Sequence, residues 1–267
     1  MLPVSPLTQS KERCARAAQN GGMPTTPVPA VSRRSVLLGA AAAALAPLPA
    51  LSAGVCTPRE LARRFDAAVT QKLQVPQNEA WIYAGLAEAE LAAQPAGLAQ
   101  PQYLLVVDSC AFIQTAFLFW RLLPGRYELV GATPASTGSA QRPGCLETPC
   151  GVFPQASAPD AGRALSSRVY DFGMHRARRA TGAGYGALHL QARAAVGRSR
   201  ALLGTPQSDG RVLLPPSLVA FLDAYGVLDA QRSDRTTPDG EQMPFAGQYL
   251  VVIDSEREER PDWSIVA

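Results

Sequence analysis

The chain has 267 residues, 47% of them hydrophobic, which is enough apolar material for one sizeable buried core. Its formal net charge is +3, but residues 1–53 hold five of the 25 basic and one of the 22 acidic side chains, so the remainder carries a net charge of −1. A nucleic-acid-binding protein needs a dense basic face. The charge of the remainder therefore argues against nucleic acid as a partner.

Residues 1–53 have the pattern of an export signal with an N-terminal extension. The run 32–38 reads SRRSVLL and is typical of the twin-arginine type. An Ala/Leu-rich run follows over 36–46, and residues 47–53 end in small side chains of the kind found at a signal cleavage site. A membrane-spanning helix needs about 20 strongly apolar residues, whereas here alanine dominates and two prolines interrupt the end. The sequence predicts a signal cleaved near Ala53, no stable membrane span afterwards, and a periplasmic or cell-envelope location.

Five cysteines are present, at Cys14, Cys56, Cys110, Cys145 and Cys150. Export would remove the first and leave four in an oxidising compartment. Cys145 and Cys150 are close enough in sequence to close a small disulfide loop, which would leave Cys56 and Cys110 as the second pair. Four cysteines allow three pairings, and the spacing alone does not choose among them.

The small number of histidines also limits the kinds of metal site that the chain could form. The chain has two histidines and no Cys-x-x-Cys pair. A zinc site built from several imidazoles is therefore excluded. Neither a metal nor a cofactor is predicted.

After the signal, residues 54–100 are predicted to form a helical appendage. Thr57 followed by Pro58 is typical of an N-cap with proline in the first turn of a helix. A second helix is predicted over 77–93, where apolar residues recur at helical spacing.

Residues 101–267 are predicted to form the main domain, which begins as a β-meander rather than as alternating strands and helices. Short runs rich in β-branched and aromatic residues predict strands, and Pro124-Gly125 predicts a turn. The expected strands are 102–108, 111–118, 126–131 and 248–254, with a helix over 217–225.

Five segments of this domain carry motifs in a fixed order. They are PASTG at 134–138, ETPCGVF at 147–153, RVYDFG at 168–173, LHL around His189, and SDGRVL at 208–213. The ordered set resembles the L,D-transpeptidase (YkuD-type) family over roughly residues 101–230. The resemblance implies a mainly β fold, an L,D-transpeptidase-like mixed β-sandwich or flattened barrel with peripheral helices.

The resemblance also implies where a site would lie. In the family a strand histidine assists a cysteine thiolate, which attacks a peptide carbonyl of the cell wall, while backbone N–H groups stabilise the oxyanion. His189, Ser208 and Gly210 match the family motif. Arg211 stands where the family has its cysteine, and Leu213 where it has an arginine. This chain is thus a degenerate member by its motif, and the nucleophilic cysteine is absent.

Three functions remain open from the sequence. The first is an exported L,D-transpeptidase-like protein that cross-links or remodels peptidoglycan by acyl transfer, with stem peptides as its partners. The second is a non-catalytic pseudoenzyme that binds peptidoglycan or a partner protein, since the guanidinium of Arg211 suits a carboxylate. The third relocates the nucleophile to Cys150. Ser208 is a weaker candidate nucleophile, because its matched position in the family does not attack.

Simpler explanations exist for two of these features. A histidine between Leu188 and Leu190 on a strand is often a polar group that hydrogen-bonds within the fold. The basic run 174–179, MHRARR, is typical of a solvent-exposed turn, and no function is assigned to His175.

Overall fold

The computed structural model describes residues 54–94, 98, 100–139, 141–156, 168–179, 184–232 and 236–265. The predicted export signal lies outside these residues. Gly54–Ala267 forms one compact unit. Within the described part of the chain, no helix combines the length and the apolar character that a membrane crossing requires.

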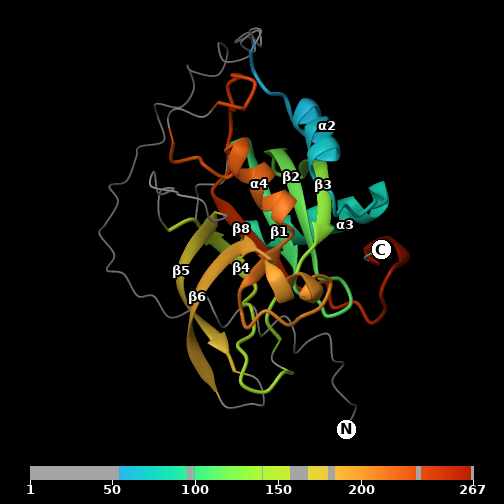
Figure 1. Ribbon diagram of the computed structural model, residues 1–267, viewed down its shortest axis with the longest axis vertical. Helices are drawn as coiled ribbons and strands as arrows, with labels where there is room; N and C mark the ends of the chain where they lie inside the picture. Colours follow the sequence, from blue (N-terminus) through green and yellow to red (C-terminus); the bar gives the residue numbers. More distant parts are fainter. Residues whose placement is uncertain are drawn as a thin grey trace, which may run out of the picture. The chain divides into compact units, whose positions relative to one another are not determined.

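Two β-sheets build this unit (Figure 1). The larger sheet has the strand order β3-β2-β1-β8-β4, and its one parallel pairing joins β1 to β8. Its strands are β1 (Gln102–Asp108), β2 (Thr115–Leu123), β3 (Arg126–Pro134), β4 (Gly151–Pro154) and β8 (Tyr249–Ile253). The smaller sheet has the order β5-β6-β7, in which β5 and β6 are antiparallel and β6 and β7 are parallel. Its strands are β5 (Val169–Arg178), β6 (Tyr185–Ala194) and β7 (Val212–Leu214).

Three α-helices and two short 3-10 helices complete the described elements. They are α2 (Pro58–Ala68), α3 (Gln77–Ala92), η2 (Gly197–Leu202), α4 (Pro216–Ala224) and η3 (Asp262–Ser264). The side chain of Thr57 accepts a hydrogen bond from the Glu60 N–H, and Pro58 occupies the first turn. The predicted start of this helix is therefore confirmed.

Hydrophobic cores lie on both faces of the larger sheet. Because successive side chains of a strand point to opposite faces, Leu105 of β1 packs in a core with α2, α4 and the smaller sheet. Leu104 packs in a second core with α3 and the β2 aromatic residues. Every residue of β1 is buried as a result. The prediction of a mainly β, sandwich-like fold with peripheral helices is confirmed.

The start of β2 differs from the prediction. Residues 111–113 form a turn, and the strand begins at Thr115. The backbone N–H groups of Ile113 and Gln114 both donate to the carbonyl oxygen of Cys110, and Gln114 has a φ of 45°. Residues 111–113, part of the apolar run that predicts a strand, thus form a tight turn before the strand begins.

The expected disulfides are not formed: Cys56, Cys110 and Cys145 are free thiols. Cys56 and Cys110 belong to the cores on opposite faces of the larger sheet, so they cannot meet. Cys145 adjoins Leu146, which pairs with the end of β5, whereas the Cys150 sulfur lies 3.9 Å from the Ser109 hydroxyl oxygen, just after β1. The chain between them is held at both ends by different partners.

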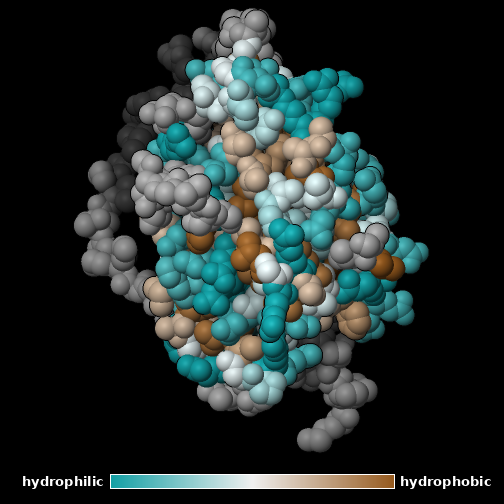
Figure 2. All heavy atoms as spheres, in the orientation of Figure 1, coloured by the Kyte–Doolittle hydropathy of each residue, from teal (hydrophilic) through white to brown (hydrophobic). Residues whose placement is uncertain are grey.

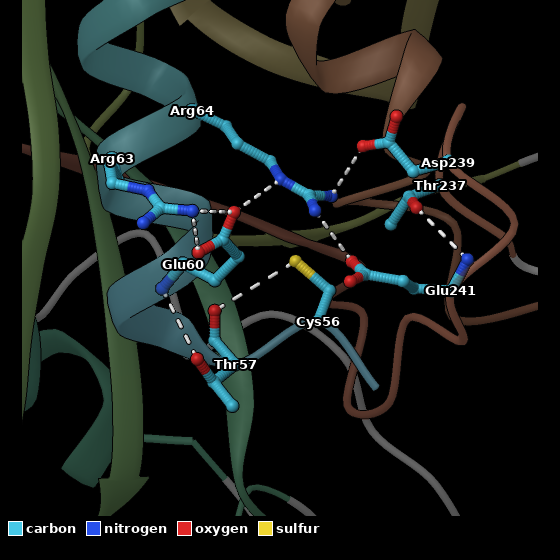
Figure 3. A network of polar contacts seen from close by, with 8 residues as sticks. All are labelled: Cys56, Thr57, Glu60, Arg63, Arg64, Thr237, Asp239 and Glu241. Atoms are coloured by element: carbon cyan, nitrogen blue, oxygen red, sulfur yellow. Dashed lines mark hydrogen bonds and ion pairs between the residues drawn. The ribbon is translucent and has the colours of Figure 1, made fainter. Parts of the chain in front are cut away.

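The guanidinium of Arg64 joins α2 to a distant loop (Figure 3). It lies 2.8 Å from Glu60 on the same helix, and 3.1 Å and 2.9 Å from Asp239 and Glu241. Cys56 lies beside this network, and burial raises the pKa of its thiol to about 11. Cys56 is therefore a protonated structural residue at neutral pH rather than a nucleophile.

Candidate functional site

The turn of residues 208–211 packs against the Ser-Thr-Gly segment at the end of β3. The Ser208 N–H donates to the carbonyl oxygen of Thr137 at 2.9 Å. Ser136 and Leu213 exchange two backbone hydrogen bonds, each 2.9 Å long, which extends β7 onto this segment. Two motif segments that lie about seventy residues apart in the chain are thus direct neighbours.

Glycine is required where these segments touch. A Cβ atom added at Gly138 would lie 2.2 Å from the backbone nitrogen of Gly210. Gly210 itself has a φ of +80°, and a Cβ atom there would lie 2.7 Å from the Leu188 side chain. A larger residue at either position would push the turn away from its support.

The Thr-Pro segment holds the same turn from the other side. The Thr148 hydroxyl, which is buried, accepts a hydrogen bond from the Gly138 N–H at 2.8 Å and donates to the Gly210 carbonyl oxygen at 3.0 Å. The Leu146 N–H donates to Asp209 Oδ1 at 3.0 Å. Three of the five motif segments therefore form one hydrogen-bonded unit.

His189 lies on the solvent-facing side of β6, between two buried leucines. Its Nε2 lies 2.8 Å from both carboxylate oxygens of Asp171 on β5, and 48% of its side chain is exposed. Asp171 is in register with Gln191, the next residue along β6 on the same side as His189. The imidazole is thus oriented by a carboxylate, and the remainder of the ring faces solvent.

Arg211 immediately precedes β7, where Val212 is in register with the buried Ala192 of β6. Extending the β6–β7 register by one residue places Arg211 opposite Gln191, which lies on the same side of β6 as His189. Its guanidinium is 3.9 Å from Asp209 Oδ2, and 40% of the side chain is exposed. We use the term outer face for this side of β5, β6 and β7.

Ser208 and Leu213 have local structural contacts. The Ser208 side chain is buried, and its hydroxyl donates to the carbonyl oxygen of Arg211 within the turn. Leu213 is buried in a small apolar cluster with Ala195 and Leu203. An arginine at position 213 would bring a charge into that cluster, which is costly without a partner.

The chemistry available on the outer face follows from these side chains. A guanidinium remains protonated at all accessible pH values and cannot attack a carbonyl, but it binds carboxylates in a bidentate manner. The imidazole of His189, held by Asp171, can accept or donate a proton. The Cys150 thiol contacts Ser109 at the end of β1 in the larger sheet. The face is thus equipped for binding an anion.

Two residues of this arrangement have no role assigned from the sequence. Asp171 belongs to a motif segment, but its pairing with His189 depends on the register of β5 and β6, which contains a bulge between Asp171 and Met174. Thr148 also belongs to a motif segment, and its contact with Gly210 joins residues far apart in the chain. The alternation of exposed and buried residues along β6 is the one local signal that indicates which side chains face outward.

No protein-family model matches the chain, and no curated protein matches it. Among the solved structures with which it can be superposed is an L,D-transpeptidase from Mycobacterium smegmatis, at 19% identity and a TM-score of 0.31, covering 57% of this chain and 58% of that one. An LD transpeptidase in complex with imipenem gives 17% identity and a TM-score of 0.31, covering 57% and 59%.

A third structure is a fused Zn-dependent amidase/peptidase/peptidoglycan-binding domain-containing protein from Clostridium acetobutylicum. It shows 12% identity and a TM-score of 0.30, and the match covers 69% of this chain and 65% of that one. The neighbours of this chain among solved structures thus include L,D-transpeptidases, and the match covers about three-fifths of the length of the two described above.

Proposed function

We propose that this protein is an exported, L,D-transpeptidase-like protein of the cell envelope that binds peptidoglycan stem peptides on its outer face. The export pattern of residues 1–53 supports the location. The observation that carries the binding function is the partly exposed guanidinium of Arg211, which stands at the motif position of the family's nucleophile and next to β7, in the sheet that also carries His189. Stem peptides are rich in carboxylates, the groups that a guanidinium recognises best.

Peptidoglycan cross-linking or remodelling by acyl transfer is the second candidate. The hydrogen bond from His189 to Asp171 favours it, because a base oriented by a carboxylate is half of a nucleophilic dyad. The thiol is the missing half at this face. Incubation of the purified protein with muropeptides separates the two candidates, since only acyl transfer yields cross-linked or trimmed products by mass spectrometry.

Binding is tested by titration of the mature protein with a stem tetrapeptide and with the same peptide amidated at its C-terminus. We expect the amide to bind about 10- to 100-fold more weakly than the free acid, because a hydrogen bond to a charged group contributes about 1.5–3 kcal/mol. Arg211→Gln is expected to weaken binding of the acid by a similar factor and to bind acid and amide alike.

Arg59→Gln, which removes an exposed arginine of α2, provides a control of equal charge and should leave both affinities unchanged. Isothermal calorimetry at 0.15 M salt, where distant charges are screened, makes the comparison specific to contacts. Equal affinity of the wild type for acid and amide, or equal losses in the two variants, would contradict a carboxylate contact at Arg211.

A further inference from the structure

The outer face continues beyond His189 along the antiparallel pair of β5 and β6. Met174 is in register with His189, and Arg176 is in register with Ala187, two residues further along β6. Residues directly opposite each other in an antiparallel pair have side chains on the same face. Arg176 is therefore on the face that carries His189 and Arg211.

The charge of Arg176 is available to a ligand, unlike that of its neighbour Arg178. Arg178 forms two hydrogen bonds with the Glu147 carboxylate, at 2.6 Å and 3.2 Å. The guanidinium of Arg176 instead lies 5.1 Å from the centre of the Tyr185 ring. Among the residues that the structure describes, no carboxylate lies within ion-pair distance of Arg176. The ring orients the cation without neutralising it.

Apolar surface lies beside both cations: Met174, opposite His189, lies between Arg211 and Arg176, and Tyr185 lies two positions beyond Ala187 on β6. The side chains of Met174 and Tyr185 are 64% and 63% exposed, values that are high for residues of their type on a strand. Figure 2, in the orientation of Figure 1, shows hydrophilic and hydrophobic side chains intermixed over the region of β5 and β6. Gln191, beside Arg211, and Ala187, beside Arg176, are four positions apart on β6, which corresponds to about 13 Å.

We propose that the outer face is a two-point clamp for an extended peptide with two carboxylates, one bound by Arg211 and the other by Arg176. An extended ligand rises about 3.3 Å per residue, so the two carboxylates would lie about four residues apart. The apolar side chains of the ligand would rest on Met174 and Tyr185. This inference rests on the proposed function and specifies the class of peptide that the face selects.

The test uses three synthetic five-residue peptides: a diacid with carboxylates at both ends, and the two monoacids in which one carboxylate is amidated. For the wild type, calorimetry at 0.15 M salt is expected to rank the diacid about tenfold above either monoacid. Arg176→Gln should reduce diacid affinity to that of one monoacid and should leave the affinity of that monoacid unchanged. Arg176→Lys keeps the charge and should retain part of the preference.

Arg178→Gln is the matched control, because it removes a charge on the same strand that Glu147 already neutralises. It should leave the diacid preference intact. Equal losses for Arg176→Gln and Arg178→Gln, or a wild type that binds the diacid no better than both monoacids, would overturn the clamp while leaving a single contact at Arg211 possible. A wild type that binds none of the peptides would overturn the proposed function itself. The amidated peptides test the clamp on the unmodified protein, so a variant that does not fold does not affect the outcome.

Discussion

Replacement of Arg168 by methionine is expected to lower the free energy of unfolding by about 3–5 kcal/mol, the usual cost of removing one partner from a buried ion pair. The Arg168 guanidinium forms a bidentate contact with Asp229, and the two side chains are 2% and 0% exposed. It also lies 3.1 Å from Asp223 and stacks on the Tyr170 ring at 4.3 Å. Without it, Asp229 would keep a buried charge and lose its main counter-ion.

Urea unfolding followed by circular dichroism measures this loss. Arg178→Met, at the end of β5, removes an exposed pair with Glu147 and should cost about 1 kcal/mol or less. The double variant Arg168→Met/Asp229→Leu removes both charges and should be more stable than Arg168→Met alone. A loss below about 1 kcal/mol for Arg168→Met would show that this pair does not support the fold.

The second large effect concerns Asp108, which lies at the end of β1 and is fully buried. Its Oδ1 accepts hydrogen bonds from the N–H groups of Cys110 and Ser255 at 2.9 Å and 3.1 Å. Burial nevertheless dominates and raises the pKa of this carboxyl from 3.8 to about 6. The folded state therefore holds its proton more tightly than the unfolded state, so this group contributes less stability as the pH rises from about 4 to about 6.

Asp108→Asn removes the ionisation and keeps the Oδ1 acceptor. We expect the variant to exceed the wild type by about 3 kcal/mol in unfolding free energy above pH 6, and to gain little at pH 4. Unfolding in urea at pH 4, 5 and 7 gives the comparison. Asp66→Asn, at an exposed carboxylate of α2, should show no such trend. A gain in unfolding free energy that is the same at all three pH values would contradict a raised pKa of Asp108 in the folded state.

Local patterns in the sequence predicted much of the fold. The Thr57-Pro58 pair identifies the start of α2 because its capping is local. The buried run of β1 is equally clear because both of its faces are covered. The predicted start of β2 was wrong because Gln114, which has a positive φ, belongs to a turn in which its side-chain amide hydrogen-bonds Thr137, a contact far away in the sequence. The sequence left the cysteine pairing open because sequence distance does not report which face of a sheet a thiol occupies.

In the candidate site, too, some features follow from local sequence and others depend on how distant segments pair. Resemblance to known motifs singled out His189, Gly210 and Arg211, and that choice remains a prediction about function. The pairing of His189 with Asp171 follows from strand register across a bulge, which no local pattern encodes. The different environments of Arg176 and Arg178 also depend on register, since only Arg178 reaches Glu147.

The central claim is that residues 189 and 211 share one face. It is tested most directly by the reactivity of Arg211→Cys toward iodoacetamide at pH 7, with mass spectrometry to separate this thiol from Cys145 and Cys150. Leu213 is kept, because it is buried. A neighbouring imidazole lowers a thiol pKa, so we expect alkylation of the new cysteine to slow by about tenfold when His189→Gln is added. Equal rates with and without the imidazole would place the two residues apart and contradict the account.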